Sequence, residues 1–230
     1  MNTKITLLFL LAGIVAFGQK IPKDKKQLIA SVENHKEDLI SISDKIWANA
    51  EIAFQETESS KLLADYAEAN GFTVERGVAN IPTAFIATYG EGKPVISVLG
   101  EFDALPGISQ KAQPTKEPLE AGAAGHGCGH NLFGTASLGA AIAVKEMIEA
   151  GEIKGTVKFI GTPAEEKFFG KLWMLEAGVW DDVDVNVSWH PSADTKADVQ
   201  SSLAMVDFIV EFNGQAAHAA ADPWNGRSAS

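Results

Sequence analysis

Apolar residues near the start of the chain recur at the spacing of amphipathic helices. One apolar stripe consists of Leu28, Val32, Leu39, Ile42 and Ile46, with His35 on the same side. Its spacing predicts a helical stretch. A second helix is predicted over residues 57–69, because Asn70 and Gly71 form a good C-terminal stop. His35 is interpreted as a packed helix histidine without a chemical role.

The pattern then changes to short apolar runs bounded by Gly and Pro, which predict buried strands. These runs are PTAFIATYG, KPVISVLGEFDALPG, TVKFIGTP and DVNVSWHP. Helices are predicted between them at 131–150 and at about 169–177, and SSLAMVDFIVEFNG is predicted to be a longer strand that begins a new unit. Alternating strands and helices predict an α/β domain around a mostly parallel sheet.

Ligands of such sheets bind beyond the carboxyl ends of the strands. Several polar residues directly follow a predicted strand, and others directly precede the helix at 131–150. We therefore expect one edge of the sheet to gather Asp103, His126, Cys128, His130, Glu165, Glu166 and His190.

Cys128, the only cysteine, lies two residues before His130 in a loop with Gly at 125, 127 and 129. Glycines permit unusual backbone dihedrals, so both side chains can point the same way. A thiolate and an imidazole suit zinc, cobalt or manganese better than calcium or magnesium. A nucleophilic Cys-His pair is the alternative interpretation.

The adjacent acids Glu165 and Glu166 favour the metal. A metallohydrolase needs one carboxylate to bind metal and another to accept a proton from the bound water. His190 adds another nitrogen ligand, whereas a cysteine protease has no use for so many ligands. His218 lies past the last predicted strand, on a second unit, and its position predicts a lid residue rather than a ligand.

Composition excludes some functions and locates the protein. The 230 residues carry a formal net charge of -11, which argues against binding to nucleic acid or to anionic membranes. Residues 1–18 combine an early lysine, an apolar run too short for a comfortable span and small residues before a cut, so they predict a signal peptide. The mature protein is therefore expected to be secreted or periplasmic, where a free thiol needs protection by burial or by a metal.

Five motifs in order resemble the metallo-amidohydrolases and peptidases of the aminoacylase and carboxypeptidase type, most closely the p-aminobenzoyl-glutamate hydrolase branch. The motifs are LGEFDALPGISQ, GHGCGHNLFGTASLGAA, GTPAEE, WHPS and AAHAAADPWNGRSA. The resemblance implies an α/β, three-layer catalytic domain, interrupted by an α+β dimerisation (lid) domain. Residues 19–199 would be the N-terminal part of the catalytic domain, and 200–230 the start of the lid.

The resemblance also implies roles for individual residues. The ligands of two divalent ions (zinc, manganese or cobalt) would be Cys128, His130, Glu166 and His190, with Cys128 shared by the metals. Glu165 would be the general base that accepts a proton from metal-activated water, and Asp103 would orient a ligand. His218 would reach the partner subunit's site and stabilise the oxyanion. The roles of Glu101, which stands where peptidase branches have a histidine ligand, and of His126 stay open.

The function expected from this resemblance is hydrolysis of an amide bond in a small N-acyl amino acid, an aminobenzoyl-glutamate-like compound or a dipeptide. Through the lid, the protein would form a homodimer or a hetero-oligomer with a paralogous subunit. Because Ser230 falls early in the lid, a fragment is expected. The alternative is a catalytically inactive or truncated metal-binding subunit that supports a paralogous enzyme.

Overall fold

The computed structural model describes residues 21–197, 203–204, 206 and 208–228. The contacts divide the chain into two compact units, Met1–Ser192 and Ala193–Ser230. The predicted signal peptide and the predicted domain boundary at residue 200 both lie outside the described residues, so they stay predictions.

The first unit contains a five-stranded sheet in the order β1-β2-β4-β3-β5. Its strands are β1 (Thr73–Arg76), β2 (Phe85–Glu91), β3 (Val95–Glu101), β4 (Gly155–Thr162) and β5 (Val185–Val187). The neighbours β4, β3 and β5 are parallel, whereas β1 and β2 join the sheet antiparallel. The predicted α/β fold is confirmed, with the parallel strands β4, β3 and β5 on one side of the sheet.

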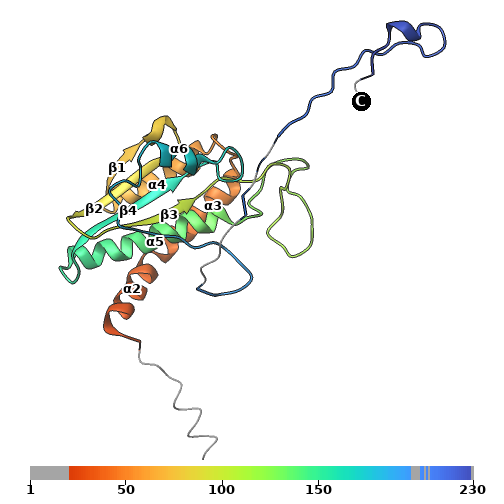
Figure 1. The fold of residues 1–230 in the computed structure, drawn as a ribbon. Helices are drawn as coiled ribbons and strands as arrows, with labels where there is room; N and C mark the ends of the chain where they lie inside the picture. The colour runs from red at the N-terminus through yellow and green to blue at the C-terminus, as the bar shows by residue number, and fades with distance from the viewer. Residues whose placement is uncertain (1–20, 198–202, 205, 207, 229–230) are drawn as a thin grey trace, which may run out of the picture. The chain divides into compact units, whose positions relative to one another are not determined.

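Helices cover both faces of this sheet (Figure 1). They are α2 (Lys23–Asn34), α3 (Lys36–Asn49), α4 (Thr57–Ala69), α5 (His130–Glu149) and α6 (Gly170–Glu176). Helices α4 and α5 pack directly on the strands, and α2 and α3 pack outside them on α5. The start of α4 is capped by Glu51, whose carboxylate accepts hydrogen bonds from the backbone N–H groups of Glu58 and Ser59 at 3.0 and 2.8 Å.

Alternation along the strands separates two apolar cores. Phe85, Ala87 and Phe159 face α4 and α5 in the larger core. The intervening residues Ile86 and Ile160 face Met174 of α6 in the smaller one. The sheet therefore lies between two helical layers, as the three-layer prediction requires.

The predicted elements need three corrections. The first helical stretch is two helices that meet at His35, whose imidazole lies 2.8 Å from the Tyr66 hydroxyl and 3.1 Å from the Glu146 carboxylate. Strand β1 was not predicted, because TVER lacks an apolar run. Of the predicted strand at 201–214, the described residues 203–204, 206 and 208–214 form none.

The second unit holds one short turn structure among its described residues. An isolated antiparallel bridge joins Gln215 to Arg227, and a 3₁₀ turn spans Pro223–Asn225. His218 lies in the loop that this bridge closes. The apolar residues of the preceding stretch, such as Leu203 and Phe208, are exposed, which explains why their pattern alone does not form a strand.

Candidate metal centre

The three parallel strands end side by side and bring the predicted acids and one histidine to a common edge. Asp103 follows β3, Glu165 and Glu166 follow β4, and His190 follows β5. Because β4, β3 and β5 are neighbours with the same direction, their carboxyl ends meet there. The expected gathering of these residues at one edge is confirmed.

The glycine-rich loop delivers Cys128 and His130 to the same edge. Gly129, with φ +85°, has the left-handed conformation that starts α5 at His130. Gly125 is needed for a different reason, since a Cβ there would lie 2.6 Å from the carbonyl oxygen of Ile108. Of the three glycines, only Gly129 uses the predicted backbone freedom.

His130 is fully buried and oriented by Asp103. Its Nδ1 lies 2.9 Å from Asp103 Oδ1 and 3.1 Å from the Asp103 carbonyl oxygen, so Nδ1 carries the proton. In the neutral ring, which is the form that binds a metal ion, the lone pair of Nε2 points toward the acids. A histidine that donates one ring N–H to a carboxylate and offers the other nitrogen is the usual arrangement of a metal ligand.

His190 is oriented in the same way by the backbone. Its Nδ1 donates to the carbonyl oxygen of Pro191 at 2.9 Å, and its Nε2 lies 3.4 Å from the sulfur of Cys128. Sγ of Cys128 and one ring nitrogen each of His130 and His190 all lie within 4.8 Å of one another. These three residues form the first group that could hold a metal ion.

A second group shares His130 with the first. A carboxylate oxygen of Glu101, one of Glu165 and a His130 nitrogen also lie within 4.8 Å of one another. Glu166, a predicted ligand, belongs to neither group, although its Oε1 lies 3.9 Å from His130 Nε2. Its backbone N–H donates to Asp103 Oδ2 at 2.9 Å, so Asp103 holds both His130 and the Glu166 backbone.

The acids determine the protonation of the nitrogen and sulfur donors. Burial alone would lower the pKa of His130, but the Asp103 and Glu101 carboxylates outweigh it and raise this pKa to about 10. Burial and the charge of Glu166 raise the pKa of the Cys128 thiol to about 12. Without a cation at the site, this shift disfavours the thiolate, whether as a nucleophile or as a metal ligand.

Buried polar atoms that lack hydrogen bonds test whether a cation fits this cluster. They include Glu101 Oε2, His130 Nε2 and Glu166 Oε1. Glu101 Oε2 lies 2.9 Å from His130 Nε2, within ion-pair distance. Unpaired donor atoms that converge with a thiol and several carboxylates fit divalent metal ions.

The two other histidines singled out in the sequence, His126 and His218, belong to neither group of candidate metal ligands. His126 Nε2 lies 3.0 Å from the carbonyl oxygen of Ile46, and burial lowers the pKa of His126 to about 4. It therefore anchors the loop as a neutral side chain. In the second unit, Nδ1 of His218 accepts hydrogen bonds from the N–H groups of Ala220 and Ala221 at 3.2 and 3.0 Å. The neutral ring of His218 thus carries its proton on Nε2, as a donor.

Two residues near the centre were not predicted from the sequence. Lys171 of α6 donates to Glu101 Oε1 at 2.5 Å and counters the acids from that side. Glu56, at the start of α4, is fully buried and accepts a hydrogen bond from Ala164, next to Glu165. An acid before a helix is usually a favourable first-turn charge at the surface, so no local pattern signals this burial.

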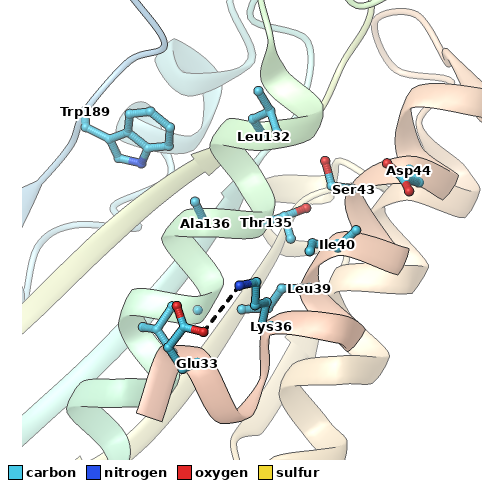
Figure 2. Close-up of a pocket in the computed structure, with 12 residues that line it drawn as sticks. Glu33, Lys36, Leu39, Ile40, Ser43, Asp44, Leu132, Thr135, Ala136 and Trp189 are labelled. Carbon is cyan, nitrogen blue, oxygen red and sulfur yellow. Dashed lines mark hydrogen bonds and ion pairs between the residues drawn. The ribbon is translucent and has the colours of Figure 1, made fainter. Parts of the chain in front are cut away.

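An apolar groove of about 520 Å³ lies beside the centre rather than at it. Figure 2 shows side chains of α3 and α5 around this groove, with Trp189 at one side and the Glu33–Lys36 ion pair at another. Trp189 N–H donates to the hydroxyl of Ser137 at 3.0 Å, and its ring packs edge-on against Phe133. The groove wall therefore also fixes the backbone that precedes His190.

Known proteins are similar to this chain in sequence and in architecture. Residues 98–223 match the sequence model of peptidase family M20/M25/M40. A subunit of the p-aminobenzoyl-glutamate hydrolase of Escherichia coli (strain K12) is 48% identical over 202 residues, which cover 86% of this chain and 42% of that protein. Xaa-Arg dipeptidase of Mus musculus is 31% identical over 217 residues, which cover 89% of this chain and 46% of that protein.

A solved structure agrees with this relationship. The crystal structure of a dinuclear metal binding peptidase of the M20 family from Bacillus subtilis superposes with a TM-score of 0.60 at 30% identity, over 72% of this chain and 44% of that one. The chain thus spans less than half the length of each of these proteins.

Proposed function

The chain belongs to peptidase family M20/M25/M40, and from this premise we propose that the protein is a metal-dependent hydrolase of amide bonds in small substrates. The proposed substrates are N-acyl amino acids, aminobenzoyl-glutamate-like amides and dipeptides, in keeping with the names of the two relatives. One observation carries the proposal: a thiol, two oriented imidazoles and several carboxylates converge at one sheet edge.

We propose that the centre holds two divalent ions, since the relative from Bacillus subtilis is a dinuclear metal binding peptidase. The thiol and imidazole donors favour zinc, manganese or cobalt. The proposed ligands are Cys128, His130, Glu166 and His190. Bound ions would supply Lewis-acid polarisation of the amide carbonyl and would acidify water at neutral pH. Asp103 keeps His130 in the ligand tautomer, and the carboxylates balance the added positive charge.

Glu165 is the proposed general base. Its side chain is 38% exposed, so its carboxylate can reach both the buried centre and a bound substrate. It would accept a proton from water and return that proton to the leaving amine. The Nε2–H of His218 is a suitable donor to a developing oxyanion, which is the role proposed for it.

Assembly and location are also proposed. Because one relative is named as a subunit of a hydrolase, we propose assembly with a second copy or with a paralogous subunit through a lid domain that begins near residue 200. The apolar run before residue 18 supports a secreted or periplasmic protein. None of the helices among the described residues is long and apolar enough to span a membrane.

Replacement of the proposed base tests the mechanism. In the full-length protein with Mn²⁺, we expect Glu165→Gln to lower turnover of p-aminobenzoyl-glutamate by about 100-fold or more, because the proton acceptor is lost. Its metal content should equal that of the wild type. The control Glu176→Gln changes an exposed acid at the end of α6 and should keep wild-type rates.

Three outcomes distinguish the hypotheses. Full activity in Glu165→Gln refutes the proposed base. Metal binding without turnover of any small amide by the wild-type protein favours the alternative, an inactive metal-binding subunit. Inactivation by alkylation of Cys128 without metal loss favours a thiol nucleophile.

A further inference from the structure

Glu56 connects three segments that are distant in sequence. Its side chain is fully buried at the start of α4. Oε1 accepts hydrogen bonds from the backbone N–H groups of Phe54 and Ala164, both at 2.9 Å. Oε2 accepts one from the hydroxyl of Thr83 at 3.2 Å. One carboxyl group thus joins the α3–α4 connection, the segment before β2 and the end of β4.

The segment that Glu56 holds at the end of β4 is conformationally strained. Ala164 has φ +58°, and Phe168 and Phe169 have φ +75° and +54°, a left-handed region that costs energy for residues with a side chain. Such conformations persist where the surroundings fix them. Besides the Glu56 bond, the carbonyl of Ala164 accepts from Gly170 N–H at 3.0 Å.

The proposed catalytic acids directly follow this held residue. Glu165 and Glu166 place carboxylate oxygens 3.9 Å from His130 Nε2. The backbone N–H of Ala164, just before the two acids, donates to Glu56. The backbone N–H of Glu166 donates to Asp103. A shift of the Ala164 backbone would move both carboxylates.

A ring contact supports the same connection. Phe54 and Phe168 stack with their ring centroids 5.6 Å apart and their planes 15° from parallel. Phe54 adjoins the Glu56 bond on the α3–α4 connection, and Phe168 belongs to the strained segment. The α3–α4 connection therefore contacts the strained segment twice, through Glu56 at Ala164 and through Phe54 at Phe168.

We infer that Glu56 is a positioning residue, whose buried carboxyl group fixes the backbone at Ala164 and thereby directs Glu165 and Glu166 to the metal centre. This role rests on the proposed function, because it matters only if these acids serve a metal-dependent reaction. Glu56 itself does not touch the centre, so its effect passes through the backbone.

Metal affinity provides a test that does not depend on turnover. In the full-length protein, we expect Glu56→Ala to weaken Mn²⁺ binding in equilibrium dialysis by about tenfold or more, and to lower kcat for p-aminobenzoyl-glutamate similarly. Glu56→Gln should restore both, because its amide oxygen can accept from Phe54 and Ala164 while its NH₂ donates to Thr83. Restoration by glutamine would indicate hydrogen bonding rather than charge.

Glu51→Ala is the matched control. It removes an acid from the same connection, but one that caps α4 and whose side chain, among the described residues, accepts hydrogen bonds from Glu58 and Ser59 alone. We expect a lower unfolding temperature with unchanged Mn²⁺ affinity. An equal loss of affinity in Glu51→Ala and Glu56→Ala would reduce the role of Glu56 to general stability and overturn the inference.

The variants also separate this inference from the proposed function. Wild-type Mn²⁺ affinity in a folded Glu56→Ala protein overturns the inference even if the enzyme is active. If Glu56→Ala does not fold, Glu56→Asp decides, since it keeps the acid but withdraws it by one methylene from Ala164. Wild-type Mn²⁺ affinity in Glu56→Asp would also overturn the inference. A wild type that binds Mn²⁺ without hydrolysing amides contradicts the proposed function alone.

Discussion

The buried acid Glu56 makes the stability of the protein depend on pH. Burial raises its pKa from 4.5 to about 7, more than its backbone hydrogen bonds lower it. A raised folded-state pKa contributes stability that is complete below pH 4.5 and is lost as the pH rises through 7. Above that pH the fold must bury a charged carboxylate next to the Asp103 charge.

We therefore expect Glu56→Gln to stabilise the protein in a pH-dependent manner. The variant keeps the hydrogen bonds but cannot ionise, so its gain in unfolding free energy should be small at pH 5 and reach up to about 3 kcal/mol at pH 8. Denaturant unfolding at both pH values measures the difference. A gain that is the same at pH 5 and pH 8 would contradict the buried titration.

Residues that directly follow a strand could be predicted from the sequence, and residues that act from a distance could not. Asp103, Glu165 and His190 stand at strand ends, so the sheet alone places them together. Glu56 and its partner Ala164 are 108 residues apart, and no local pattern relates them. The same holds for Lys171, whose contact with Glu101 depends on how α6 packs on the sheet.

At the scale of elements, the close approach of α5 to β3 places His130 beside Glu101. Gly134 lies one turn after His130, and a Cβ there would lie 2.6 Å from the backbone oxygen of Glu101. We expect Gly134→Ala to destabilise the fold by about 1–3 kcal/mol despite the higher helix propensity of alanine, because the backbone of β3 must move. Thermal unfolding, with Mn²⁺ affinity measured alongside, checks this.

Gly139→Ala in the same helix is the control. Its added Cβ would meet a terminal methyl of Leu39 at 2.8 Å, and a flexible side chain can move where a backbone carbonyl cannot. Gly139→Ala should therefore be close to neutral. Equal losses in the two variants would show that crowding at α5, rather than its distance from β3, limits stability.

Hydrophobic periodicity predicted the elements whose own sequence carries a clear apolar face. Helix α4 was predicted over residues 57–69, and it spans Thr57–Ala69. The failures share a physical cause, which is dependence on a neighbour. Strand β1 forms because β2 offers it an edge, and no strand forms among the described residues of the apolar stretch that includes Phe208 and Phe212.

At the scale of the whole molecule, the alternating pattern predicted the α/β class and the functional edge, since parallel strands share a direction. The pattern did not specify that β1 and β2 would join antiparallel. That choice depends on the direction in which each connection returns to the sheet, which polar and apolar periodicity does not encode. The position of the candidate site was predictable because Asp103, Glu165 and His190 each follow one of the parallel strands in the sequence.

Strand β5 lies at the end of the sheet among the described residues. This strand pairs with β3, and no described strand pairs with its other side. Val185 and Val187 are 51% and 50% exposed there, and α6 adds exposed Leu172 and Leu175 nearby. An unpaired apolar edge is a template for pairing with another chain.

We expect a protein of residues 21–230 to self-associate at micromolar concentration, and Val187→Lys to reduce the associated fraction, because a charge on an edge strand disfavours pairing. Light scattering after size-exclusion chromatography measures that fraction. Leu119→Lys is the control: Leu119 is 61% exposed but lies in the loop before the metal centre, outside any strand. If both variants reduce association equally, general surface charge is responsible; a loss confined to Val187→Lys identifies the β5 edge as the contact.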